Sequence, residues 1–169
     1  LLLIATAAVL LPLAASLPFG FRGRLAPAQD GLRLVIRRTL RNTGTIPLRS
    51  RHYAHNFVRI DGHPIGRDYR LELPFAPRPV APATLPAAAR LEGRMLAFLP
   101  EVLEETFWTS LGGFAATPEH NRVTVRHVPS GAAVSFATAL PLADFRVYAT
   151  SRVLCPEPFV DLALAPGEE

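Results

Sequence analysis

The chain contains no lysine and a single cysteine, and each shortage limits what the protein can be. All 18 basic residues are arginine, which we attribute to a coding bias such as that of a GC-rich genome. The lone Cys155 cannot form a disulfide within the chain, so it does not reveal the redox compartment. No Cys/His spacing typical of a structural zinc site is present. We interpret Cys155 as a small buried hydrophobe and expect no metal site.

Several functional signatures are also missing. The sequence has no Gly-rich phosphate loop, nucleophile elbow, internal repeat or coiled-coil heptad. The arginines are scattered and form no basic block, so the net charge of +4 is better explained by a solvated sheet face than by a nucleic-acid site. The residues in question include Arg33, Arg37, Arg41, Arg59, Arg122 and Arg146. We expect no nucleic-acid partner.

What is present describes a globular protein. Hydrophobic residues make up 49% of the chain and charged residues 19%, which excludes a disordered segment. With 169 residues the chain is long enough for one domain with a substantial core. Its 17 prolines and 11 glycines break long helices and favour short strands joined by turns.

The first residues form a separate apolar segment, for which we set the bounds 1–17. It resembles the core of a signal peptide without its basic head, ending near Ala14-Ala15-Ser16. The alternatives are the edge of a fragment, or a short membrane anchor, which Pro12 and Pro18 disfavour. We expect no stable membrane span. A signal remnant would make the protein exported or periplasmic, and otherwise a cytoplasmic location is expected.

Alternating apolar and polar residues predict strands along residues 18–169. The predicted extended segments are 31–39, 46–57, 69–75, 91–99, 122–128, 133–138, 145–153 and 160–164. Residues 76–89 are predicted to form an irregular loop, and residues 100–109 to include a helical turn because Pro100 and acidic residues suit a helix start. Strands at this spacing predict an all-β fold, an antiparallel β-sandwich.

A His-Asn pair lies between aromatic residues in Tyr53-Ala54-His55-Asn56-Phe57. It follows a predicted strand and precedes a turn, so the imidazole should lie at a strand end, where a sheet can hold a proton-transfer group rigidly. A distant carboxylate, Glu157, lies between two prolines in an apolar context. The alternatives are a structural histidine bonded to a backbone carbonyl and a solvated carboxylate in a turn.

Five short motifs in this order resemble the galactose mutarotase-like (aldose 1-epimerase) superfamily, over roughly Pro18 to Glu169. They are Leu40-Arg41-Asn42-Thr43-Gly44, Tyr53-Ala54-His55-Asn56-Phe57, Ile65-Gly66-x-Asp68-Tyr69, Cys155-Pro156-Glu157 and Pro166-Gly167-Glu168. The resemblance implies an antiparallel β-supersandwich that binds carbohydrate in a groove on one concave sheet face. Since a full domain of that family is much longer, it also implies that this chain is the C-terminal portion, a fragment.

The resemblance implies that His55 and Glu157 are the catalytic acid and base. The match departs from the family pattern where Asn56 and Phe57 follow the histidine directly and where Pro156 replaces a leucine. Mutarotation needs a base for the anomeric hydroxyl proton and an acid for the ring oxygen, with no metal or organic cofactor. We therefore expect the two side chains to face each other across a space that admits a pyranose ring.

Five further residues are candidate sugar contacts, each with a structural alternative. Aromatic rings can stack on a sugar, and short polar side chains can bond its hydroxyls, but the same residues also serve in cores and turns. The candidates are Tyr53, Asn56, Asp68, Tyr69 and Trp108.

The function expected from these residues is that of an isomerase, an aldose 1-epimerase-like protein acting on or binding a hexose. The alternative is a non-catalytic β-sandwich module that binds a hexose or a polysaccharide. A third possibility is a purely structural sandwich in an exported protein.

Overall fold

The computed structural model describes residues 6–8, 19–27 and 34–169, with side-chain environments from Thr39 onward. Within this part of the chain every regular element is a strand except one 3₁₀ turn, η1 (Pro118–His120). None of the described residues forms a helix that is long and apolar enough to cross a membrane. The predicted segment 1–17 lies outside the described residues except for β1 (Thr6–Ala8).

The chain divides into two compact units, one of Leu1–Leu10 with His52–Val160 and one of Leu11–Arg51 with Asp161–Glu169. In the second unit, β2 (Phe19–Pro27) pairs antiparallel with β3 (Leu34–Asn42). Two strands, β4 (Leu48–Tyr53) and β14 (Leu154–Leu164), have residues in both units.

Asn42 joins the turn after β3 to the end of the chain. Its amide nitrogen donates to the carbonyl oxygens of Ile46 at 2.9 Å and Leu164 at 3.0 Å, and its Oδ1 accepts from the backbone N–H of Gly44 at 3.0 Å. The backbone N–H of Gly167 donates to the Asn42 carbonyl oxygen at 2.8 Å. Two of the motifs noted in the sequence, around Asn42 and Gly167, therefore meet in this unit through hydrogen bonds.

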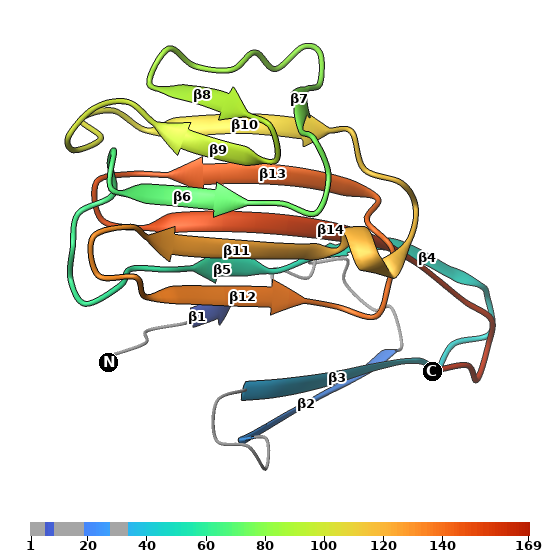
Figure 1. Cartoon of the computed structure of the whole chain (residues 1–169). Coiled ribbons are helices and arrows are strands. Elements are labelled where there is room, and N and C mark those ends of the chain that lie inside the picture. Colours follow the sequence, from blue (N-terminus) through green and yellow to red (C-terminus); the bar gives the residue numbers. More distant parts are fainter. Residues whose placement is uncertain (1–5, 9–18, 28–33) are drawn as a thin grey trace. The chain divides into compact units, whose positions relative to one another are not determined.

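The first unit is an antiparallel β-sandwich whose two layers are visible in Figure 1. One sheet has the order β4-β14-β13-β10-β7, and the other has the order β12-β11-β6-β9-β8. The remaining strands of the first sheet are β7 (Arg78–Pro79), β10 (Phe107–Gly112) and β13 (Asp144–Ala149). The second sheet comprises β6 (Tyr69–Glu72), β8 (Ala89–Glu92), β9 (Met95–Phe98), β11 (Arg122–His127) and β12 (Ala133–Ala137). A short strand, β5 (His55–Phe57), pairs with β1.

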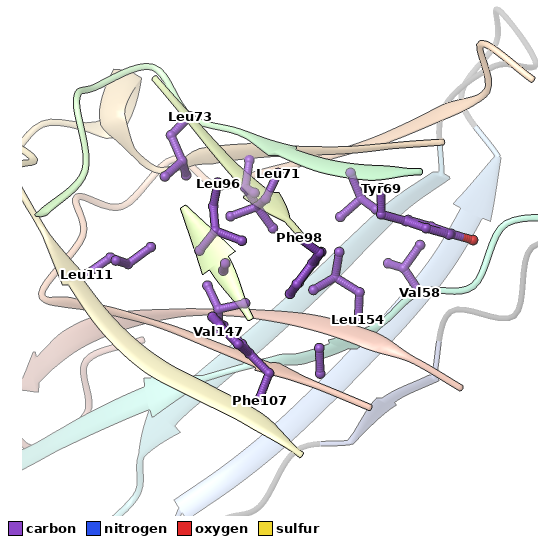
Figure 2. Packing of buried hydrophobic residues seen from close by; sticks show 14 of the residues in the cluster. Val58, Tyr69, Leu71, Leu73, Leu96, Phe98, Phe107, Leu111, Val147 and Leu154 are labelled. Carbon is purple, nitrogen blue, oxygen red and sulfur yellow. The ribbon is translucent and has the colours of Figure 1, made fainter. Parts of the chain in front are cut away.

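The core lies between these sheets, because alternate residues of each strand point inward. In β13 the buried residues are Phe145, Val147 and Ala149, while the residues between them are half-buried on the opposite face. Figure 2 shows inward side chains of both sheets, such as Phe98 and Leu154, packed together. This alternation sorts the side chains of the first sheet into a core face and an opposite face.

The structure confirms the all-β antiparallel sandwich and most of the predicted strands. Three local predictions were wrong. Residues 91–99 are not one strand, because Gly93 adopts a positive φ of 57° and turns the chain between β8 and β9. Residues 100–109 contain no helical turn; the chain there runs irregularly into β10. The strand predicted at 160–164 begins six residues earlier, at Leu154.

The early start of β14 matters because it places Glu157 in a strand rather than in a turn. Proline lacks a backbone N–H, so it is usually kept out of central strands. Leu154 donates its N–H to Val58 beside β5, and Pro156 and Pro158 follow at two-residue steps. Successive N–H groups of a strand point in alternate directions. The positions at which Pro156 and Pro158 lack an N–H therefore face the same side as the Leu154 N–H, toward β5 and away from β13. The ladder to β13 stays intact from Asp144↔Phe159 to Ala149↔Leu154.

Candidate functional site

The candidate site lies on the face of the first sheet opposite the core. Residues directly opposite each other in antiparallel strands project to the same side of the sheet. Glu157 lies opposite Arg146, and Cys155 lies opposite Tyr148. Since Tyr148 is in turn opposite Trp108 of β10, polar and aromatic groups from three strands share one surface.

The short strand β5 places His55 on the same surface. Val58 and Leu154 exchange two backbone hydrogen bonds of 2.8 and 2.9 Å, which set the register of this segment against β14. His55 and Glu157 each lie three residues from that bridge, in opposite directions along antiparallel chains, so they come to face each other. The Asn56 side chain donates to the Pro156 carbonyl oxygen at 3.1 Å and reinforces the junction.

Three chemically active side chains are in mutual contact. Nδ1 of His55 lies 2.7 Å from Oε1 of Glu157. The thiol of Cys155 lies 3.7 Å from the same Oε1, to which it can donate, and 3.7 Å from Nδ1 of His55. The side chains of His55 and Glu157 are only 20% and 8% exposed, and Cys155 is fully buried. We call this group the His-Cys-Glu cluster.

Aromatic rings surround the imidazole and restrict its rotation. Phe57 stacks on it at 5.4 Å between ring centroids, and Tyr53 meets it edge-on at 4.9 Å. The Tyr53 hydroxyl also lies 3.2 Å from Nε2 of His55, so both ring nitrogens have a polar partner. Tyr53 is itself held by stacking on Phe159 at 4.4 Å. The imidazole is therefore oriented in advance of any ligand.

The surroundings of Cys155 disfavour the thiolate form of its side chain. Burial raises the pKa of the Cys155 thiol well above its usual range, and the neighbouring negative charge of Glu157 raises it further. The group therefore stays protonated at neutral pH, whereas thiol chemistry requires the thiolate. The raised pKa therefore opposes cysteine-based acyl or disulfide transfer at the cluster.

No protein-family model, curated protein or solved structure matches this chain. The resemblance noted in the sequence therefore remains a prediction, and the function has to be argued from the site itself.

Of the other candidate residues, two lie next to the His55–Glu157 pair, and a third lies on the same sheet face two strands from β14. Tyr53 bonds to His55, and Asn56 holds the junction with β14. Trp108 is 46% exposed on the same sheet face, with the guanidinium of Arg146 6.0 Å from its ring. The face therefore carries an accessible aromatic ring and an adjacent cation.

Two of the candidate residues lie elsewhere. Tyr69 is fully buried in the core, as Figure 2 shows, and its hydroxyl bonds the backbone of Ile60 and His63. It offers no face to a ligand. Asp68 lies in the turn before β6, in the other sheet, where its carbonyl oxygen accepts from Val128. The motif Ile65-Gly66-x-Asp68-Tyr69 did not distinguish a buried position or a turn in the other sheet from a position on the site face.

Sequence reasoning missed the participation of Cys155 and the neighbouring Arg146 and Tyr148. The signal for Cys155 was available, because Cys155 and Glu157 are two residues apart and share one face of any strand. It was overlooked because Pro156 and Pro158 made the segment look like a turn. The positions of Arg146 and Tyr148 depend on cross-strand register, which a single sequence does not supply.

The pair His55 and Glu157 also differs from expectation in one respect. We expected the two groups to stand apart on either side of a pyranose ring. Instead they touch, and a separation of 2.7 Å leaves no room for a ring between them. Any substrate must approach the pair from its exposed side.

Proposed function

We propose that this sheet face binds a hexose and that His55 and Glu157 interconvert its anomers by acid–base catalysis. The observation that carries the proposal is the 2.7 Å contact between an imidazole nitrogen and a largely buried carboxylate, close to an exposed sheet face. Such pairs hold a proton ready for transfer and tune each other's charge. The motif resemblance to aldose 1-epimerases supports the same chemistry.

The contact geometry suits an edge-on approach of the sugar. The anomeric hydroxyl and the ring oxygen are both bonded to the anomeric carbon, so a contacting acid and base can reach both from one side. Glu157 would take the proton from the anomeric hydroxyl, and protonated His55 would give one to the ring oxygen. The bond from ring oxygen to anomeric carbon breaks, and the anomeric carbon becomes an aldehyde.

Rotation about the adjacent carbon–carbon bond then exposes the other face of the aldehyde. The ring oxygen attacks that face, returns its proton to His55, and the new anomeric oxygen takes one from Glu157. Acid and base finish in their starting states, so the cycle consumes nothing. Trp108 and Tyr53 supply apolar surfaces on which a pyranose can stack.

The test is the rate of α/β exchange of glucose and galactose, followed by polarimetry or by NMR exchange spectroscopy. We expect His55→Ala and Glu157→Gln each to slow exchange by about 10² to 10⁴-fold, the usual contribution of one acid–base group. Glu101→Gln is the matched control, because Glu101 is an exposed carboxylate paired with Arg67. Equal rates in all three variants would refute the proposed roles.

The second candidate is a module that binds carbohydrate without turnover. It is favoured by the contrast between Trp108, 46% exposed on the same sheet face, and the His55 and Glu157 side chains, only 20% and 8% exposed, because the aromatic ring is more accessible than the acid–base pair. Trp108 is the only tryptophan, so its fluorescence reports a ligand directly. A saturable fluorescence change with sugar and no anomer exchange would select binding, and the absence of both would exclude carbohydrate.

A further inference from the structure

The His-Cys-Glu cluster has the composition of a transition-metal site. We propose that Nδ1 of His55, Sγ of Cys155 and a carboxylate oxygen of Glu157 bind Zn²⁺, with water as the fourth ligand. The three donor atoms all lie within 4.8 Å of one another. Imidazole nitrogen, thiolate sulfur and carboxylate oxygen are the three donor types that zinc uses, and three protein ligands with one open position is a recurrent arrangement.

The observed spacing is close to what a tetrahedral zinc ion needs. Zinc bonds of about 2.3 Å to sulfur and about 2.0–2.2 Å to nitrogen and oxygen place sulfur roughly 3.6 Å from each of the other ligands. Sγ of Cys155 lies 3.7 Å from both Nδ1 of His55 and Oε1 of Glu157. Only the direct contact of 2.7 Å between Nδ1 and Oε1 must widen, to roughly 3.4 Å.

The backbone and surrounding side chains hold the donors in place. Cys155 and Glu157 project from one face of β14, and the paired hydrogen bonds of Val58 with Leu154 hold His55 opposite them. A histidine ligand is usually oriented by a bond from its other ring nitrogen. Tyr53 provides that bond, since its hydroxyl lies 3.2 Å from Nε2.

Charge balance favours a divalent cation. A thiolate and a carboxylate carry two negative charges, which Zn²⁺ neutralises, so the occupied cluster is uncharged in a largely buried place. On binding, the Cys155 thiol loses its proton to solvent, as coordinated thiols do. The proton shared by Nδ1 of His55 and Oε1 of Glu157 is released as well, so the imidazole binds in its neutral form with its remaining proton on Nε2. Mg²⁺ and Ca²⁺ are disfavoured because they require oxygen ligands.

The experiment uses the full chain freed of metal by a chelator and titrated with Co²⁺ as a coloured substitute for zinc. We expect a thiolate-to-cobalt charge-transfer absorption that saturates at one equivalent. Cys155 is the only cysteine, so this band has one possible source. A titration without the band overturns the proposal, and this readout needs no variant.

Zinc affinity is then measured by competition with a chromogenic chelator. Cys155→Ser should weaken it by more than about 100-fold and abolish the cobalt band, and Tyr53→Phe should weaken it by roughly 10-fold. His120→Ala is the control, because this histidine lies outside the cluster and its Nδ1 accepts from the backbone of Ala115. Unchanged affinity in Cys155→Ser, or equal losses in Cys155→Ser and His120→Ala, would show binding at other histidines and refute the site.

The inference does not rest on the proposed sugar chemistry, although both use His55 and Glu157. Zinc should suppress anomer exchange in the unsubstituted chain but not in Cys155→Ser, which keeps the acid and the base. A cobalt band without any anomer exchange would support the metal site and reject the isomerase. Anomer exchange that zinc does not inhibit, together with the absence of a cobalt band, would support the isomerase and reject the metal site.

Discussion

Outside the candidate site, His127 is a buried titratable residue of β11. Its ring stacks on His63 at 4.1 Å between centroids and meets Tyr69 at 5.2 Å. Its Nδ1 lies 2.8 Å from the Ser130 hydroxyl in the following turn. The structure therefore buries this imidazole against a second histidine.

This environment opposes protonation. Desolvation lowers the pKa of His127, and the neighbouring His63 lowers it further, while the carboxylates of Asp68 and Asp61 act in the opposite direction. The unfolded chain takes up a proton here near pH 6.5, whereas the folded chain resists it until a lower pH. The associated stability is therefore complete above about pH 6.5 and is lost as the pH falls toward the folded pKa.

We predict that His127→Asn reduces the acid sensitivity of folding, because asparagine keeps a polar group near Ser130 but does not titrate. Thermal unfolding followed by circular dichroism at about pH 7.5 and about pH 5.5 should show a smaller drop in Tm for this variant than for the unsubstituted chain. The control is His120→Asn at η1. An equal drop in all three proteins would contradict the role of His127.

The predictability of single residues was uneven for a physical reason. His55 and Glu157 were named from their types and motif contexts, and the structure places them in contact. Tyr69 and Asp68 were named on the same grounds, yet one is buried and the other is in a turn of the opposite sheet. Residue type gives the chemistry that is available, but the strand partner and the face decide whether a ligand can reach it.

At the scale of elements, one tight crossing depends on a glycine. Gly66 lies beneath the segment that follows β9, and a Cβ there would overlap the carbonyl oxygen of Glu101. Two backbone bonds hold the crossing closed: Arg67 donates to Pro100 at 2.7 Å, and Leu103 donates to Ile65 at 2.8 Å. The added methyl group would meet backbone atoms of Glu101 and Val102 rather than a flexible side chain, so this segment cannot move aside without breaking these bonds.

We predict that Gly66→Ala lowers the free energy of unfolding by about 3 kcal/mol or more, the upper end for overpacking. Gly62→Ala is the comparison: it has a φ of 77° but nothing within 4 Å of the added methyl group. That change should cost only about 1–2 kcal/mol of backbone strain. Urea unfolding midpoints measure both losses, and a Gly62→Ala loss as large as that of Gly66→Ala would refute the crossing argument.

Strands were predictable from sequence wherever apolar and polar residues alternate, as in β11 with its regular burial pattern. The prediction failed where a competing signal dominated. Prolines 156 and 158 indicated a turn, although their missing N–H groups all face one side of β14. Gly93 divided what looked like one strand, because a single glycine with positive φ at the first central position is enough for one type of two-residue hairpin turn.

At the scale of the whole molecule, the principal hydrophobic core lies within one unit. Every member of this buried cluster falls between Val58 and Leu154. In the unit of Leu11–Arg51 and Asp161–Glu169, the interactions that the structure describes include the β2–β3 ladder and the hydrogen bonds of Asn42. Local stability follows buried apolar contacts, so the two units should differ.

We predict that amide hydrogen exchange is slowest in β11 and β13 and markedly faster in β2 and β3. Mass spectrometry of exchanged, proteolysed protein measures this directly. Asn42→Ala should speed exchange further in β3 and near Gly167 while leaving β11 unaffected, because its bonds join only those segments. Uniform protection across the chain would indicate a single cooperative unit.

The sandwich class and its antiparallel order followed from strand spacing, but the assignment of strands to sheets did not. Strands β6 and β11 are distant in sequence yet adjacent in one sheet, and β10 and β13 are adjacent in the other. Such pairings are determined by long-range packing, which alternation alone does not encode.

The solitary sulfhydryl in β14 provides a built-in kinetic probe. An aryl disulfide reagent cannot reach Cys155 while the strand is in place, since the sulfur has no exposed surface. Its colour develops only when that part of the sheet detaches, so the observed rate is the opening equilibrium multiplied by the intrinsic thiol reactivity. Dividing the observed rate by the reactivity of an unprotected thiol thus gives the population of this opened state in the unaltered polypeptide.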